Sequence, residues 1–228
     1  RGLSTTLIAH GRAVGMPTDS DMGNSEVGHN AIGAGRIFEQ GASLVSQAIE
    51  TGDLFRGESW RSLISHLRRS GGSLHLIGLL SDGNVHSHID HLKALVSRAD
   101  AENIPHVFVH ALLDGRDVPK TSALQYVDEI EATLSAIRAQ PGRQYWVASG
   151  GGRMTTTMDR YESDWSIVAR GWSAHVLGVG RSFESLRGAV ETLRAERPGI
   201  ADQELSEFVI SRHGKPIGSI RDGDAVIA

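Results

Sequence analysis

Residues 74–113 read LHLIGLLSDGNVHSHIDHLKALVSRADAENIPHVFVHALL, and this stretch decides the fold class. It opens with an apolar run, LHLIGLL (74–80), which stops at SDG (81–83) and predicts a buried strand. Segment 88–102 then has apolar residues at helical spacing, and PHVFVHALL (105–113) predicts a second strand that ends at Asp114-Gly115. A strand, a helix and a strand of these lengths predict a βαβ unit with parallel strands.

The same alternation continues along the chain. Residues 121–139 predict a helix, 144–148 a third strand ended by the glycines at 150–152, and about 160–172 and 183–196 two further helices. The tail, 208–228, predicts short strands around turns. We therefore expect an α/β fold with a mostly parallel sheet over residues 41–228. The segment 1–40 is polar and punctuated by glycine, and we expect no core from it alone.

The composition excludes several classes of protein. The formal net charge is −4, so an anionic ligand needs a local arginine cluster, and we expect no nucleic-acid partner. The chain has no cysteine, which excludes disulfides, thiolate nucleophiles and cysteine-ligated metals. No apolar run approaches the roughly 20 residues that span a bilayer, and no signal-peptide pattern opens the chain. These features predict a soluble, cytoplasmic protein without a membrane partner.

Polar motifs follow all three predicted strands. The first strand leads into SDGNVHSH with His86, the second into DGRD with Arg116 and Asp117, and the third into SGGGR with Arg153. The carboxyl ends of parallel strands share one edge of a sheet, and ligands of α/β folds bind there. We therefore expect these side chains to converge on one site.

The histidines at positions 86, 88 and 91 allow two interpretations. Three histidines in six residues suggest a metal site, but the spacing is not the i, i+4 pair of a helical metal motif and no carboxylate ligand set is evident. Capping of the first turn of the following helix is the simpler interpretation. His86 precedes that helix and is the best candidate for contact with an anion.

The arginines also have structural alternatives. Asp114-Gly115 by itself is typical of a turn, whereas the planar guanidinium of Arg116 suits a phosphate or carboxylate, which it binds through two hydrogen bonds. Asp117 could orient that guanidinium or accept a hydrogen bond from a substrate hydroxyl. Arg153 and Arg160 bracket MTTTMD (154–159), and Arg160 could instead pair with an acidic side chain at a helix start.

Ser25, in DMGNSEVGHN (21–30), is a helix cap or a nucleophile. With Asn24 it could start a helix over the residues that follow. A helix N-terminus also binds a phosphate favourably, through its free backbone N–H groups and the helix dipole. A serine hydroxyl needs a base or a metal to react, and no complete set of metal ligands is evident around it.

Five motifs in order extend these interpretations: MGNSEVGHNAIGAGRIF (22–38), LLSDGNVHSHIDHL (79–92), VHALLDGRDVPKTSA (109–123), SGGGRMTTTMDRYESDW (149–165) and DGDAV (222–226). Together they resemble the cofactor-independent, that is 2,3-bisphosphoglycerate-independent, phosphoglycerate mutases, in the form of the plant and trypanosomatid branch. The resemblance implies an isomerase that interconverts 3-phosphoglycerate and 2-phosphoglycerate in glycolysis and gluconeogenesis through a phosphoserine intermediate.

The resemblance also assigns parts and residues. Residues 1–40 resemble a piece of a metal-bearing, alkaline-phosphatase-like α/β domain, and 41–228 resemble the phosphotransferase domain inserted into it. Ser25 is implied as the nucleophile and as a ligand of one of a pair of manganese ions. The implied substrate-binding residues are His86, Arg116, Asp117, Arg153 and Arg160. No 2,3-bisphosphoglycerate is needed, and a monomer is expected.

The family's other metal-binding motifs do not occur in this chain. We therefore expect a fragment that does not catalyse the mutase reaction alone. The alternative function is a stand-alone phosphoglycerate-binding domain without catalysis. A related phosphatase or phosphopentomutase is a third possibility, against which the motifs of 41–228 argue because those relatives carry different insertions.

Overall fold

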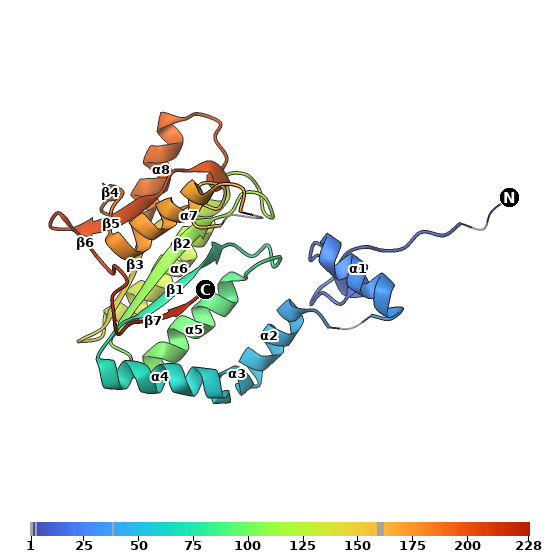
Figure 1. Ribbon diagram of the computed structural model, residues 1–228, viewed down its shortest axis with the longest axis horizontal. Helices are drawn as coiled ribbons and strands as arrows, with labels where there is room; N and C mark the ends of the chain where they lie inside the picture. Colours follow the sequence, from blue (N-terminus) through green and yellow to red (C-terminus); the bar gives the residue numbers. More distant parts are fainter. Residues whose placement is uncertain (1, 3, 38, 159–161) are drawn as a thin grey trace.

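A computed structural model describes residues 2, 4–37, 39–158 and 162–228. Its helices alternate with strands after an N-terminal part that is entirely helical and irregular (Figure 1). The α-helices are α1 (Ser25–Ala34), α2 (Gly41–Glu50), α3 (Asp53–Arg56), α4 (Glu58–Ser70), α5 (Ile89–Ala101), α6 (Ala123–Arg138), α7 (Trp165–Trp172) and α8 (Leu186–Glu196). Short 3₁₀ turns are η1 (Gly11–Val14) and η3 (Asp202–Glu204), and η2 (Ser173–Leu177) is a π-helical turn that continues α7.

The described strands form one mixed sheet in the order β4-β5-β3-β2-β1-β7, with β6 paired to β5. Strands β1, β2, β3 and β7 are parallel to their neighbours in that group, whereas β5 runs antiparallel to β3. Their bounds are β1 (Leu74–Leu80), β2 (His106–Leu113), β3 (Gln144–Gly152), β4 (Arg181–Phe183), β5 (Phe208–Arg212), β6 (Lys215–Pro216) and β7 (Ala225–Ile227).

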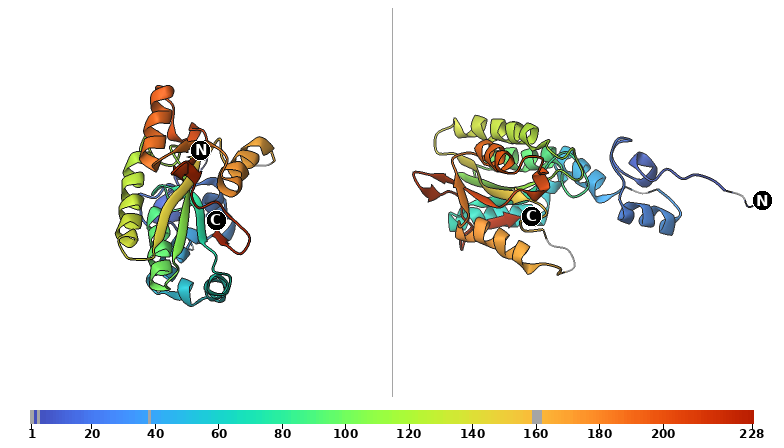
Figure 2. Two further views of the ribbon diagram at one scale, coloured as in Figure 1. Left: turned by 90° about the vertical axis from the view of Figure 1, so that its left-hand side faces the viewer. Right: turned by 90° about the horizontal axis from the view of Figure 1, so that it is seen from above.

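The two faces of the sheet are covered differently. Helices α6 and α8 lie on one face and α7 lies on the other, as both views of Figure 2 show. The main apolar core lies on the α6 side and includes buried residues from α4, α5, α6 and α8, among them Leu67, Val96, Ile130 and Val190. Burying such side chains contributes about 1.5–3 kcal/mol each, so this layer dominates the stability of the fold.

The predicted βαβ order is confirmed, and the predicted third strand is too short. Instead of stopping at the glycines, β3 runs through them to Gly152. A Cβ on Gly150 would lie 2.4 Å from the Ala111 carbonyl oxygen, and one on Gly152 would lie 2.3 Å from Gln203. The glycines therefore allow neighbouring backbone to pack closely and do not act as strand breakers.

Three helices before the first strand, α2, α3 and α4, were not predicted from the sequence. The helix predicted to start at 183 starts at Leu186, because residues 181–183 form β4 and the Ser185 side chain caps the helix by accepting from the Gly188 N–H at 3.1 Å. The helix predicted from about 160 is α7, which begins at Trp165, and residues 159–161 are outside the described part.

The N-terminal part lies to one side of the sheet (Figure 1). It has a small apolar cluster of its own, formed by Val14, Met16 and Val27. The Gln40 side chain and backbone tie the start of α2 to this part, since they donate to the carbonyls of Val14 and Gly15. In the described residues, no helix has the length and apolarity needed to cross a membrane.

Candidate functional site

Three loops meet at the carboxyl ends of β1, β2 and β3, and Asp114 lies at their centre. Its side chain is 2% exposed and accepts hydrogen bonds from the Ser81 hydroxyl at 2.7 Å and from Arg153 at 3.1 Å. It also accepts from the backbone N–H groups of Arg116 and Asp117. Burial alone would raise the pKa of Asp114, but these hydrogen bonds outweigh it and lower the pKa. Asp114 is thus a buried carboxylate that joins the three loops.

Arg153 is the buried cation of this site. Its guanidinium Nη1 lies 3.1 Å from Asp114 Oδ1 and 2.5 Å from Asp117 Oδ2, and the side chain is 8% exposed. Within the described residues both ion pairs use Nη1, which leaves Nη2 and Nε for other partners. A guanidinium fixed in this way is preorganised for a planar anion such as a phosphate or carboxylate.

The sequence suggested that Asp117 could orient the guanidinium of its neighbour Arg116. In the structure Asp117 orients Arg153 instead. The Arg116 side chain is exposed, as is that of His86 in the loop after β1. The two loops touch, because a Cβ on Gly83 would lie 2.9 Å from the Asp117 Cβ. The structure thus brings Asp117 and Arg153 into contact and places Arg116 and His86 in the adjoining loops. Arg160 lies outside the described residues.

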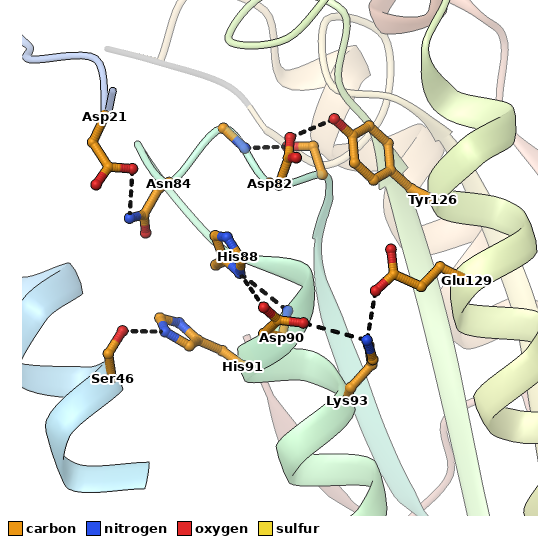
Figure 3. Close-up of polar contacts among 12 residues, drawn as sticks. Asp21, Ser46, Asp82, Asn84, His88, Asp90, His91, Lys93, Tyr126 and Glu129 are labelled. Atoms are coloured by element: carbon orange, nitrogen blue, oxygen red, sulfur yellow. Dashed lines mark hydrogen bonds and ion pairs between the residues drawn. The ribbon is translucent and has the colours of Figure 1, made fainter. Parts of the chain in front are cut away.

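The remaining two histidines of the cluster have structural roles (Figure 3). His88 is the N-cap of α5 and accepts a hydrogen bond from the Asp90 N–H at 3.1 Å. His91 lies on α5 with its Nε2 2.9 Å from the Ser46 hydroxyl of α2. The capping interpretation is correct for His88. Burial, followed by the neighbouring His88, lowers the pKa of His91.

Ser25 is the first residue of α1, and its side chain is exposed. The cap is Asn24, whose side chain accepts from the Val27 N–H at 3.0 Å, so the Ser25 hydroxyl has no capping duty. Upstream of it, Asp21 accepts a hydrogen bond from Asn84 in the loop after β1 at 3.1 Å, as Figure 3 shows. This contact links the segment that leads to Ser25 with the strand-end loops.

The described residues do not make a manganese site. Among the described residues, no group of three or more histidine, aspartate and glutamate side chains is arranged to hold a metal ion. Ser25 alone offers a single oxygen, and Mn²⁺ is held by several oxygen or imidazole ligands.

Arg153 and Asp117 were among the predicted residues, but other residues that build the site were missed. Asp114 was interpreted only as a turn residue, and Ser81 was not singled out. Asp202 was also missed; it is fully buried, pairs with Arg194 through two hydrogen bonds of 2.7 Å, and accepts from the Ala123 N–H at the start of α6. The only sequence signal was the Asp-Gly pair at 114–115, where Gly115 has φ +118° and a Cβ would lie 2.9 Å from the Lys120 carbonyl oxygen.

Comparison with known proteins places the chain in a family. Residues 45–228 match the family model described as BPG-independent PGAM N-terminus (iPGM_N). The chain belongs to this family. The resemblance stated from the five motifs is therefore confirmed.

Relatives of this chain include bacterial, trypanosomatid and plant proteins. It is 58% identical over 221 residues to a "Probable 2,3-bisphosphoglycerate-independent phosphoglycerate mutase" of Leptospira interrogans. It is 53% identical to the 2,3-bisphosphoglycerate-independent phosphoglycerate mutase of Trypanosoma brucei and 52% identical to a probable one of Arabidopsis thaliana. In the first two the alignment covers 97% of this chain and 40% of the relative.

The fold of this chain also matches a solved structure. A crystal structure of Leishmania mexicana phosphoglycerate mutase, determined at low cobalt concentration, superposes with a TM-score of 0.92 and 52% sequence identity. The match covers 96% of this chain and 40% of the other. The α/β fold class predicted from the sequence is thus confirmed, and the chain spans about 40% of the length of the relatives that it matches.

Proposed function

We propose that this chain supplies the substrate-binding residues and the serine nucleophile of a 2,3-bisphosphoglycerate-independent phosphoglycerate mutase. The observation that carries the proposal is the buried Arg153, held by Asp114 and Asp117 where three strand ends meet. Family membership and the relatives' names support the reaction, an isomerisation of 3-phosphoglycerate and 2-phosphoglycerate. Residues 1–40 would belong to the phosphatase part and 41–228 to the phosphotransferase part.

In this proposal the arginines bind the two anionic groups of the substrate. Arg153 has its guanidinium plane fixed and offers its remaining N–H groups, while the exposed Arg116 and His86 reach the ligand from the adjoining loops. Arg160 is assigned to the same set from its motif. Holding the glycerate by both ends keeps it in place while the phosphoryl group is absent, so that the group returns to the neighbouring hydroxyl.

Ser25 is proposed as the acceptor of the phosphoryl group. A bond forms between Ser25 Oγ and phosphorus as the bond to the glycerate oxygen breaks, and the proton that Ser25 loses is balanced by the one that this oxygen takes up. A second transfer then moves the phosphoryl group from Ser25 to the other hydroxyl of the glycerate, whose proton returns to Ser25 Oγ. The first turn of α1 suits this role, because free backbone N–H groups at a helix N-terminus attract a phosphate. Manganese, a monomeric state and a cytoplasmic location stay predictions from the family resemblance.

Calorimetric titration of the 228-residue chain with 3-phosphoglycerate tests the binding part of this proposal. We expect Arg116→Ala to weaken binding about tenfold or more, because a charge-assisted hydrogen bond contributes about 1.5–3 kcal/mol. Arg61→Ala, which removes an exposed arginine on α4, is the matched control and should bind as the unaltered chain does. Equal affinities for the Arg116 variant and the unaltered chain would contradict the assignment.

A mutase assay on the chain with added manganese tests the catalytic part. We expect binding without turnover, since the described residues around Ser25 form no metal-binding group that would ionise its hydroxyl. Turnover close to that of a full-length relative would show this expectation to be wrong. Binding without turnover by the corresponding full-length protein would favour the stand-alone binding domain instead.

A further inference from the structure

The sheet face under α7 carries a continuous series of hydrogen-bonded polar side chains, buried in the middle and half-buried at both ends, that the proposed reaction does not use. Asp224 Oδ2 lies 3.1 Å from His75 Nε2, and His75 Nδ1 lies 2.9 Å from His110 Nε2. From there His110 Nδ1 lies 2.6 Å from Ser149 Oγ, which in turn lies 2.7 Å from His175 Nδ1. His175 Nε2 lies 2.8 Å from the Thr157 hydroxyl.

The members of this series come from separate elements. His75 is on β1, His110 on β2, Ser149 on β3 and His175 on the π-helical turn after α7. These four side chains are at most 3% exposed. Asp224 lies directly before β7 and is also held by the Ser73 and Arg221 N–H groups. This series of hydrogen-bonded side chains thus crosses β1, β2 and β3, from Asp224 to the loop that contains Thr157.

Burial keeps the imidazoles neutral. It lowers the pKa of His175 to about 4 and that of His110 well below its usual value, with the neighbouring histidines adding to the effect at His110. Burial also lowers the pKa of His75, although Asp224 opposes it. A neutral imidazole has one N–H donor and one acceptor nitrogen, so each ring must donate on one side and accept on the other.

The carboxylate of Asp224 then determines which nitrogen of each imidazole carries the proton and which way each hydroxyl donates. It only accepts, so His75 donates from Nε2 and accepts at Nδ1, which makes His110 donate from Nε2 as well. The Ser149 hydroxyl therefore donates to His110 Nδ1 and accepts from His175 Nδ1. His175 Nε2 is left as an acceptor, and the Thr157 hydroxyl must donate to it.

Thr157 is a strained residue in the loop that begins with Arg153. Its φ of +70° is in the left-handed region, which a β-branched residue rarely adopts. Its N–H donates to the Ile167 carbonyl at 3.0 Å, and a Cβ on Gly171 would lie 2.2 Å from its hydroxyl oxygen. Such a conformation persists only where the surroundings hold it.

We propose that Asp224, acting through this ordered series, positions Thr157 and with it the loop 153–158 for ligand binding. His75, His110, Ser149 and His175 are positioning residues in this arrangement, and none of them touches the ligand. The last step, from loop position to affinity for a phosphorylated acid, rests on the proposed function. The proton order itself does not.

Long-range ¹⁵N NMR of the histidine side chains at pH 7 tests the proton order without any variant. We expect neutral rings, with the proton on Nε2 in His75 and His110 and on Nδ1 in His175. A different tautomer or a cationic ring at any of them would overturn the proposal. In Asp224→Asn, whose fold is checked by its amide spectrum, His175 should become a mixture of tautomers, whereas a merely structural role of Asp224 would leave His175 unchanged.

Calorimetry with 3-phosphoglycerate tests the effect on the loop. Thr157→Val removes the hydroxyl and should weaken binding about tenfold, whereas Thr157→Ser, which keeps it, should bind nearly as the unaltered chain does. Thr133→Val, at a half-buried position of α6 that is not part of this series of side chains, is the matched control and should change nothing. Equal binding by Thr157→Val would overturn the positioning role. Absence of binding by the unaltered chain would instead overturn the proposed function, and the NMR result would still decide the proton order.

Discussion

The arginine site and the Ser25 segment differ in how the chain holds them. Arg153, in the loop after β3, is fixed by two carboxylates of the neighbouring loop after β2, inside the main body of the fold formed by the sheet and its helices. Ser25 lies exposed at the first turn of α1, which is ordered by the Asn24 cap and a small apolar cluster. The buried ion pairs thus preorganise the proposed substrate-binding arginine, whereas the proposed nucleophile lies on a helix that only a cap and a small apolar cluster are seen to stabilise.

The largest expected effect follows from removing the centre of the arginine site. Asp114→Ala should lower the free energy of unfolding by about 3–5 kcal/mol, because Arg153 loses a buried partner and several donors lose their acceptor. Urea denaturation followed by circular dichroism measures this. Asp128→Ala, which removes one partner of the exposed Arg187, is the control and should have no measurable effect. A small loss for Asp114→Ala would mean that the two regions are held equally weakly.

Acid should weaken the main body next. The pKa of His175 is lowered to about 4 in the folded state from an ordinary value of 6.5, so below pH 6.5 the unfolded chain binds more protons. Its contribution to stability is therefore complete above pH 6.5 and is lost as the pH falls toward 4. Between pH 7 and pH 5 the loss at His175 is about 2 kcal/mol.

Urea denaturation at the two pH values measures this loss. His175→Asn should show a smaller dependence on pH than the unaltered chain. His213→Asn is the matched control, since His213 is exposed in the β5–β6 turn with φ +52°, a conformation that asparagine accepts. It should keep the full pH dependence. If the free energy of unfolding changed equally with pH in the His175 variant and in the control, this would contradict a buried neutral His175.

The smallest effect concerns the Ser25 segment. Asn24→Ala removes the α1 cap and should cost about 1 kcal/mol locally. We expect faster hydrogen exchange at the Val27 amide and no change in the unfolding of the main body. Asn30→Ala, at an exposed position inside α1, should leave that amide protected. Loss of stability throughout the chain after Asn24→Ala would show that the two regions are not separately held.

Several site features were predictable because they depend on local pattern. The apolar runs at 74–80 and 105–113 and the helical period between them predict the βαβ unit. Polar motifs at consecutive strand ends predict loops that meet at one edge. The contact of Arg153 with Asp117 agrees with that expectation. The motifs also identified the family, which the family match then confirmed.

The pairing inside the site was not predictable, because it depends on which loops come into contact. Asp117 is adjacent to Arg116 in the sequence but pairs with Arg153, which lies 36 positions away. The central role of Asp114 depends on Ser81 and Arg153, which are 33 and 39 positions from it. The Asp-Gly pair at 114–115 reads the same whether the aspartate is only a turn residue or, as here, a buried acceptor of four hydrogen bonds.

The sequence by itself determined the alternation of strands and helices from β1 to β3, the edge of the sheet where the polar motifs gather, and the family. Only the tertiary structure decided how the buried polar groups pair. A register shift between β2 and β3 sets His110 opposite Ser149, and Asp224 reaches His75 across 149 positions of sequence. The physical reason is that apolar periodicity and turn chemistry act over a few residues, whereas a buried hydrogen bond is satisfied by whichever partner the fold brings within about 3 Å.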